Sequence, residues 1–239
     1  MKNWLPKLRD SLMHLVYPAS CIHCGEQLGP GASVLCDPCG SLLEMLDPEE
    51  RCPRCFNLQG ADGHCRYCAK NPSIFYRTGA VFSYMGPPAS IIKKMKYGCQ
   101  PHLAKGAGAF LIAQFEKMDW SMPDAIVPVP VSFFHWLERG FNQSTLLANE
   151  LAKVLQVPVW DALKRSGPSL SQAGLTLEQR KLLGKKQFKL KGNYPIEDKN
   201  ILLIDDVMTS GSTLNRCAEA IYQKCPQTLS ALTFCKTEK

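Results

Sequence analysis

Short apolar runs alternate with stretches of helical period along the last two thirds of the chain. The apolar runs predict buried strands at 75–85, 124–131, 157–160, 200–205 and 229–236. Apolar residues that recur every three or four positions predict helices at 87–97, 102–117, 142–156 and 212–224. Strands that alternate with helices are typical of a mainly parallel sheet in an α/β domain.

Two segments depart from this pattern. Residues 3–17 carry apolar side chains at helical spacing before Pro18, which predicts a short amphipathic helix packed on the protein's own core. An anchor on a membrane surface is disfavoured because the segment has few basic residues. Residues 165–187 are polar and basic with little periodicity, so they predict a mobile loop.

Composition and charge narrow the class of protein. The chain has 239 residues, of which 45% are hydrophobic and 21% are charged, so disordered and collagen-like classes are excluded. The sequence contains no apolar stretch of the roughly 20 residues that a membrane span needs, and no secretory apolar region near Met1, so we expect a cytoplasmic protein. The net charge is −1 over residues 1–70 and +8 over 71–239, which sums to +7 and places any basic surface in the larger part.

Eight of the twelve cysteines form four C-x2-C pairs, a spacing that lets one turn present two sulfurs to one metal. These residues predict one or two structural zinc sites of four cysteines each, and redox pairs or an iron–sulfur cluster are less favoured because the pairs occur in tandem. Spacing alone leaves sequential and interleaved pairing open. The eight metal candidates are Cys21, Cys24, Cys36, Cys39, Cys52, Cys55, Cys65 and Cys68. The single cysteines, which we expect to be small hydrophobic residues, are Cys99, Cys217, Cys225 and Cys235.

The most informative stretch runs from Ile201 to Thr213 and reads ILLIDDVMTSGST. Asp205 and Asp206 follow an apolar strand, and a loop of small hydroxyl residues leads from them into a helix. Such a loop at a helix N-terminus presents N–H groups to a phosphate, while the carboxylates accept hydrogen bonds from sugar hydroxyls or hold Mg2+ through water. The predicted ligand is therefore a ribose 5-phosphate unit. The Walker A and G-x-G-x-x-G motifs are both absent.

This stretch resembles the phosphoribosyl pyrophosphate (PRPP) motif of type I phosphoribosyltransferases. The whole chain resembles the ComF/GntX family of competence-associated, phosphoribosyltransferase-like proteins with an N-terminal zinc finger. The resemblance rests on the order of the C-x2-C pairs, SIIKKMKYG, IVPVPVSFFHWLERGFNQSTLLANELA, RSGPSLSQAGLTLEQR and the PRPP motif. It implies an α/β fold of the type I phosphoribosyltransferase class, a mainly parallel sheet flanked by helices. The expected parts are an N-terminal helix at 1–19, a zinc-binding module at 20–70 and the phosphoribosyltransferase-like domain at 71–239.

The resemblance also implies roles for individual residues. Asp205 and Asp206 would bind the ribose hydroxyls. The 5-phosphate would be held by Thr209, Ser210, Gly211, Ser212 and Thr213. The pyrophosphate and its Mg2+ would lie near Lys96, Val129, Pro130 and Arg139. The catalytic residues of the loop over the site would be Arg165, Gln172 and Arg180. In that loop Ser169 replaces the family's usual Thr, which is a mild change. Leu183 replaces an Asn that is common after the loop Arg, and this second change puts a catalytic role of the stretch in doubt.

Two functions follow from the family resemblance. The first is a competence protein that binds PRPP or ribose 5-phosphate and takes part in natural transformation, with single-stranded DNA and proteins of the DNA-uptake machinery as partners. The second is an active phosphoribosyltransferase of nucleotide metabolism with no role in DNA handling, although no set of residues identifies an acceptor base. Basic residues are candidates for binding the phosphates of a nucleic-acid strand. The alternative is that they belong to a solvated lid that helps to hold PRPP. These candidates are Lys93, Lys94, Lys181, Lys185 and Lys186.

Overall fold

The structure is a computed structural model that describes residues 20–29, 34–60, 63–166 and 187–238. The predicted helix at 3–17 and most of the predicted loop at 165–187 lie outside these residues.

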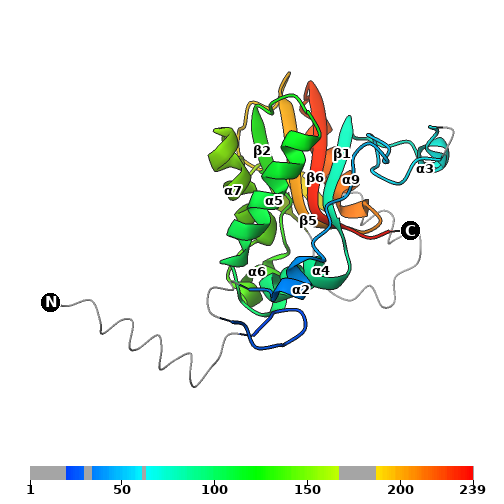
Figure 1. Cartoon of the computed structure of the whole chain (residues 1–239). Coiled ribbons are helices and arrows are strands. Elements are labelled where there is room, and N and C mark those ends of the chain that lie inside the picture. Colours follow the sequence, from blue (N-terminus) through cyan, green and yellow to red (C-terminus); the bar gives the residue numbers. More distant parts are fainter. Residues whose placement is uncertain (1–19, 30–33, 61–62, 167–186, 239) are drawn as a thin grey trace, which may run out of the picture.

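A parallel sheet of four strands forms the centre of the molecule (Figure 1). The strands are β1 (Arg77–Ser83), β2 (Ala125–Pro128), β5 (Asn200–Met208) and β6 (Thr228–Lys236), in the order β1-β6-β5-β2. The middle strands β5 and β6 are almost continuously buried, since helices cover both faces of a parallel sheet. Because every pairing is parallel, all four carboxyl ends lie at one edge of the sheet, where α/β proteins bind ligands.

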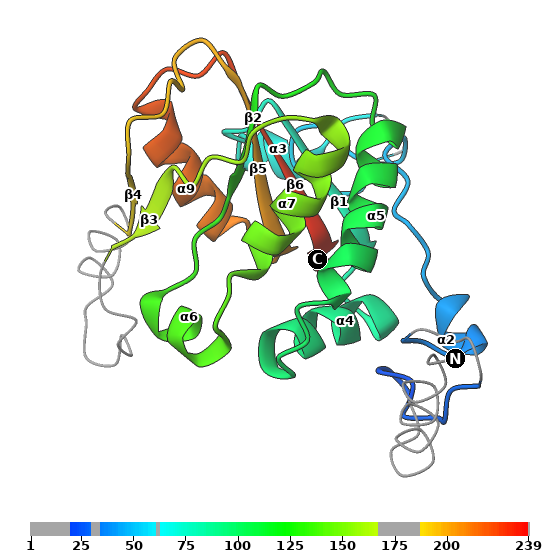
Figure 2. The same ribbon diagram turned by 90° about the vertical axis from the view of Figure 1, so that its left-hand side faces the viewer.

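Helices lie on both sides of this sheet, as Figure 2 shows. Helices α5 (Leu103–Lys117) and α7 (Gln143–Leu155) pack against each other and against the strands on one face. Helix α9 (Ser212–Tyr222) lies on the other face. Helices α4 (Gly86–Tyr97) and α6 (Phe133–Arg139) lie at the edge where the strands end.

Several predicted elements need correction. The strand expected at 124–131 ends at Pro128, and 157–160 forms only one bridge, between Val159 and Ile126, because Pro158 interrupts it. Helix α6 was not predicted. Its apolar residues are exposed instead of packed into the core, and they are Phe133, Phe134, Trp136 and Leu137. Strands β3 (Leu163–Arg165) and β4 (Phe188–Leu190) pair antiparallel across the two ends of the predicted loop.

The second half of the cysteine-rich segment is fastened to strand β1 and to the core. The backbone N–H and the hydroxyl of Thr78 donate to the carbonyl oxygens of Pro53 and Arg54, both at 2.8 Å. Phe56 is 2% exposed and belongs to the main hydrophobic core. The cysteine-rich segment also contains two short helices, α2 (Asp37–Gly40) and α3 (Arg66–Lys70).

The four single cysteines divide into two groups. Cys217 and Cys235 are buried, as expected of small hydrophobic residues. The same expectation is wrong for Cys99 and Cys225, which are exposed. Both lie just beyond a helix, where the chain turns with positive φ values of 50° and 47°, so their side chains point away from the core.

No helix in the described ranges combines the length and the apolarity that crossing a membrane requires.

Candidate functional site

Two adjacent carboxylates lie buried at the carboxyl edge of the sheet. Asp205 and Asp206 are 9% and 6% exposed and belong to strand β5 itself, which continues to Met208. The hydroxyl of Ser144, in the first turn of α7, donates to Oδ1 of Asp205 at 2.9 Å. The ammonium of Lys96, near the end of α4, lies 2.9 and 2.8 Å from the two carboxylate oxygens of Asp206. Elements far apart in the sequence thus converge on this pair.

The environment of the pair disfavours two full negative charges. Burial, followed by the negative charge of Asp206, raises the pKa of Asp205 to about 7. The hydrogen bond from Ser144 and the positive charge of Lys96 lower this pKa, but by less. A cation or a set of hydroxyl donors at the pair would stabilise the ionised form.

The loop from Thr209 to Thr213, which we call the phosphate loop, connects β5 to α9. Gly211 is the N-cap of α9 with a φ of 74°, a conformation that glycine adopts without strain. Because Gly211 has no side chain, it cannot cap the first turn of the helix. The hydroxyl of Ser210 accepts from the N–H of Ser212 at 3.4 Å, and Ser212 and Thr213 are exposed. This exposed helix start is suited to an anion.

Buried polar atoms without a partner lie where α6 leads into α7. Gly140 ends α6 in the left-handed conformation, and Arg139 donates from Nη1 to Oε1 of Gln143 at 3.3 Å. The guanidinium also lies over the ring of Tyr97, 5.3 Å from its centroid. Within the described residues, Nε of Arg139 and Nε2 of Gln143 are buried and have no hydrogen-bond partner. Since buried donors are nearly always paired in folded proteins, these two are suited to an acceptor atom of a ligand.

The segment after β2 is held by backbone contacts at the same edge. Val129 is buried, donates from its N–H to the carbonyl of Ile204 and accepts from Nδ2 of Asn142, both at 2.9 Å. Pro130 follows and is half-buried. Asn142 also caps α7 by accepting from the N–H of Ser144, so one side chain aligns this segment with the helix that reaches Asp205.

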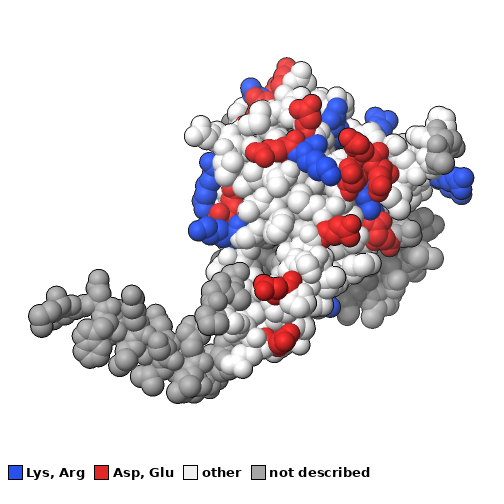
Figure 3. Space-filling model, in the orientation of Figure 1, with Lys and Arg blue, Asp and Glu red and all other residues white. Residues whose placement is uncertain are grey.

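The remaining candidate residues are Arg165, two lysines of α4 and a group outside the described residues. Arg165 ends β3, and its guanidinium lies over the ring of Phe188, 5.7 Å from the centroid. Lys93 and Lys94 are exposed on α4. Five candidates lie outside the described residues: Gln172, Arg180, Lys181, Lys185 and Lys186. On the face that Figure 3 shows, basic side chains are scattered and acidic ones gather at the upper right, so the described part of this face offers no basic track.

Sequence reasoning missed Ser144 as a member of the site. Its hydroxyl reaches Asp205 across 61 residues of sequence, a contact that depends on how α7 packs on β5. The one local signal is the cap at Asn142, which marks Ser144 as a residue of the first helical turn.

The eight paired cysteines form two separate clusters in sequential order. We call them the first cysteine cluster (Cys21, Cys24, Cys36, Cys39) and the second cysteine cluster (Cys52, Cys55, Cys65, Cys68). Within each cluster the sulfur atoms lie within 4.8 Å of one another.

Sulfur–sulfur distances of 3.6 Å for Cys24 and Cys36 and 3.8 Å for Cys52 and Cys68 approach the roughly 3.8 Å of a tetrahedron with 2.3 Å zinc–sulfur bonds. The residues therefore fit two structural zinc sites, each closed by four cysteines.

The chain is similar to several known proteins. Residues 141–239 match the family described as "Phosphoribosyl transferase domain". The DNA utilization protein YhgH of Shigella flexneri is 28% identical over 232 residues, which cover 93% of this chain and 99% of that protein. Competence protein F of Haemophilus influenzae is 28% identical over 210 residues, 84% of this chain and 90% of that protein. The solved glutamine PRPP amidotransferase from B. subtilis, complexed with ADP and GMP, is 16% identical over 54% of this chain and 25% of its own, with a TM-score of 0.39.

Proposed function

The chain belongs to the family of competence protein F and its relatives with a phosphoribosyltransferase domain, and from this premise we propose that it binds PRPP at the carboxyl edge of its sheet. The observation that carries the proposal is the pair Asp205 and Asp206, buried within β5 just before an exposed loop of small polar residues. The ribose hydroxyls donate hydrogen bonds to the carboxylates, and the 5-phosphate accepts hydrogen bonds from N–H groups of the phosphate loop.

The pyrophosphate of PRPP lies on the other side of the carboxylates in this proposal. Lys96 and Arg139 supply positive charge there, and the unpaired donors of Arg139 and Gln143 gain an acceptor. Mg2+ bound with PRPP supplies further positive charge beside Asp205 and Asp206 and lowers the cost of ionising both. Lys96, which neutralises Asp206 without ligand, turns to the pyrophosphate when hydroxyls and Mg2+ take over that role.

Calorimetric titration of PRPP with Mg2+ tests the proposal. We expect saturable binding by the wild type and loss of it in the double variant Asp205→Asn with Asp206→Asn, which removes the charge but keeps the side-chain volume. Glu219→Gln is the matched control, since Glu219 is exposed on α9 and lies in the helix body, outside the phosphate loop. Equal PRPP affinity in the wild type and the double variant would refute the proposal.

The homologues support a role in competence, and we propose that this role includes handling of single-stranded DNA in natural transformation, together with proteins of the uptake machinery. Lys93 and Lys94 lie exposed on α4, at the edge where the carboxylates lie, so a strand bound there would pass the PRPP site. Binding through phosphates weakens as salt rises, by a slope of about 0.7 per phosphate contact on a single strand.

Titration of a labelled oligonucleotide at two salt concentrations tests the DNA-binding proposal. We expect weaker binding and a smaller salt slope in the double variant Lys93→Ala with Lys94→Ala. Lys224→Ala is the control, because Lys224 follows the far end of α9 at the opposite edge of the sheet. Absence of binding, or binding that salt does not change, would refute DNA handling but not PRPP binding.

A further inference from the structure

A cavity of about 90 Å3 separates the second cysteine cluster from the phosphate loop. Cys55, Asn57 and Tyr67 line it on the cluster's side, and Thr209, Ser210 and Gly211 line it on the loop's side. The proposed phosphate site thus lies next to the second cysteine cluster, which is about 150 residues away in the sequence.

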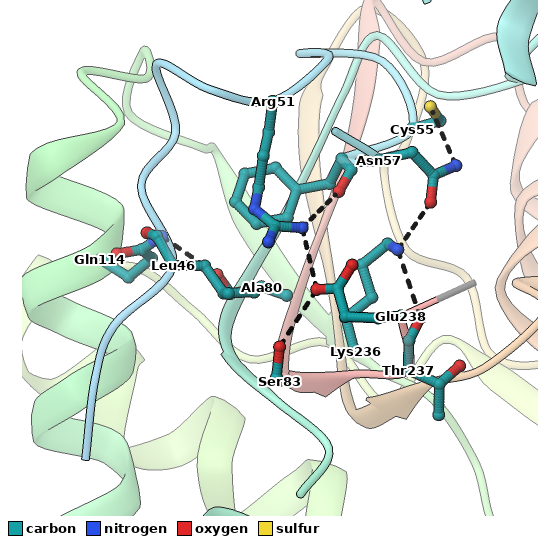
Figure 4. Close-up of polar contacts among 11 residues, drawn as sticks. Leu46, Arg51, Cys55, Asn57, Ala80, Ser83, Gln114, Lys236, Thr237 and Glu238 are labelled. Atoms are coloured by element: carbon teal, nitrogen blue, oxygen red, sulfur yellow. Dashed lines mark hydrogen bonds and ion pairs between the residues drawn. The ribbon is translucent and has the colours of Figure 1, made fainter. Parts of the chain in front are cut away.

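A line of hydrogen bonds joins the two sides of this cavity (Figure 4). The amide of Asn57 donates from Nδ2 to the sulfur of Cys55 at 3.4 Å. Its Oδ1 accepts from the ammonium of Lys236 at 2.7 Å. Lys236 is the last residue of β6, is 3% exposed, and pairs in register with Met208, the residue before the phosphate loop. The next residue, Thr237, donates from its N–H to the carbonyl of Met208 at 3.0 Å.

The charges along this line are complementary when a metal is bound. Four thiolates around a divalent ion carry a net charge of about −2, and a thiolate accepts a hydrogen bond far better than a thiol does. The metal-bound cluster therefore fixes the amide of Asn57 with its nitrogen toward sulfur and its oxygen toward Lys236. That orientation holds the buried ammonium, and with it the ends of β5 and β6 from which the phosphate loop starts.

We propose that metal occupancy of the second cysteine cluster and ligand binding at the phosphate loop strengthen each other through Cys55, Asn57 and Lys236. This inference rests on the proposed function, because it concerns the same phosphate site. Thermodynamic linkage makes the effect reciprocal. A ligand at the loop raises the affinity of the second cluster for its metal, and removal of that metal lowers the affinity of the loop for the ligand by the same factor. The first cysteine cluster does not line this cavity and lies outside the line of contacts.

The experiment titrates the full chain with a competing colorimetric chelator and measures the zinc released at equilibrium, with and without saturating ribose 5-phosphate. Two double variants, Cys36→Ser with Cys39→Ser and Cys65→Ser with Cys68→Ser, assign the release phases to the two clusters. We expect ribose 5-phosphate to raise the zinc affinity of the second cluster by about fivefold, the lower end of typical coupling, and to leave that of the first unchanged. Asn57→Leu, which can neither donate nor accept, should abolish the effect while zinc content stays the same. Asn71→Leu is the control, because Asn71 lines the same cavity but lies outside the line of contacts, and this variant should keep the ligand effect.

Calorimetry with ribose 5-phosphate on the same samples separates the possible failures. Absence of binding overturns the proposed function and the inference with it. Binding that leaves zinc release unchanged, or that lowers release equally from both clusters, overturns the inference alone, since an equal effect reports only general stabilisation. A ligand effect that persists in Asn57→Leu and in Lys236→Met also overturns it.

Discussion

At the scale of single residues, Lys96 carries two roles in this account. It neutralises Asp206 in the structure, and in the proposed complex with PRPP it would pair with the pyrophosphate. Its side chain is half-buried, so the pairing is less screened than a surface ion pair. A ligand with a pyrophosphate should therefore depend on Lys96 more than a ligand without one.

Replacing Lys96 by methionine should lower PRPP affinity by about tenfold more than it lowers ribose 5-phosphate affinity, since a hydrogen bond to a charged group is worth about 1.5–3 kcal/mol. Calorimetry with both ligands measures this difference. Lys153→Met, on the exposed side of α7, is the control. An equal loss for the two ligands would place Lys96 away from the pyrophosphate.

The raised pKa of Asp205 makes stability depend on pH. The unfolded carboxyl loses its proton near pH 4, whereas the folded one keeps it up to about pH 7. Between these values the folded state binds more protons, so the free energy of unfolding falls as pH rises. Urea unfolding at several pH values should show this fall in the wild type and a flatter profile in Asp205→Asn. Parallel profiles would contradict the assignment.

At the scale of elements, the sequence predicted the strands and helices whose apolar pattern decides their burial. Strands β5 and β6 and helices α4, α5, α7 and α9 follow the expected segments closely, because each packs an apolar face or run into the core. Helix α6 has apolar residues but buries none of them, and β3 and β4 have three residues each. β3 and β4 pair residues that lie more than 20 positions apart in the sequence, and the local hydrophobic pattern does not predict such long-range pairing.

The candidate site was only partly predictable for the same reason. The carboxylates and the phosphate loop are contiguous, so a local motif shows them. The pairing of Lys96 with Asp206 spans 110 residues and that of Ser144 with Asp205 spans 61, and both depend on how the helices pack. The unpaired donors of Arg139 and Gln143 likewise become visible only in the folded chain.

Asn142 links an element boundary to the site. It caps α7 and also holds the carbonyl of Val129. Asn142→Ala should lower the free energy of unfolding by about 1–2 kcal/mol, the usual cost of a lost cap, and should weaken PRPP binding because Ser144 loses its alignment. Urea unfolding and calorimetry test both effects. Asn149→Ala, exposed in the middle of α7, should change neither. A stable variant with unchanged affinity would contradict the positioning role.

At the scale of the whole molecule, the second cysteine cluster belongs structurally to the sheet. Phe56 enters the main core directly after Cys55, and Arg51 pairs with Glu238 beyond the end of β6 at 3.0 Å (Figure 4). Gln114 of α5 also holds the chain beside β1, by donating to the carbonyl oxygens of Leu46 and Ala80. Loss of metal from this cluster should therefore destabilise the sheet as well.

We expect about two zinc ions per chain and unequal effects of removing them. Cys52→Ser with Cys55→Ser should lower the Tm of the whole chain more than Cys21→Ser with Cys24→Ser does. Phe56→Ala should cost about 3–5 kcal/mol, whereas Phe133→Ala, exposed on α6, should cost little. Metal analysis and calorimetric melting test these statements. Equal effects of the two pairs would show that the second cluster is not part of the core structure.

The most direct test of the central claim is phosphorus NMR of ribose 5-phosphate titrated with the chain, because its single phosphate resonance reports on the phosphate loop alone. We expect a saturable shift of that resonance with the wild type and a much weaker one with Asp205→Asn and Asp206→Asn combined, which removes the partners of the ribose hydroxyls. A resonance that stays unchanged at saturating protein would contradict the claim that this loop and its two aspartates hold a sugar phosphate.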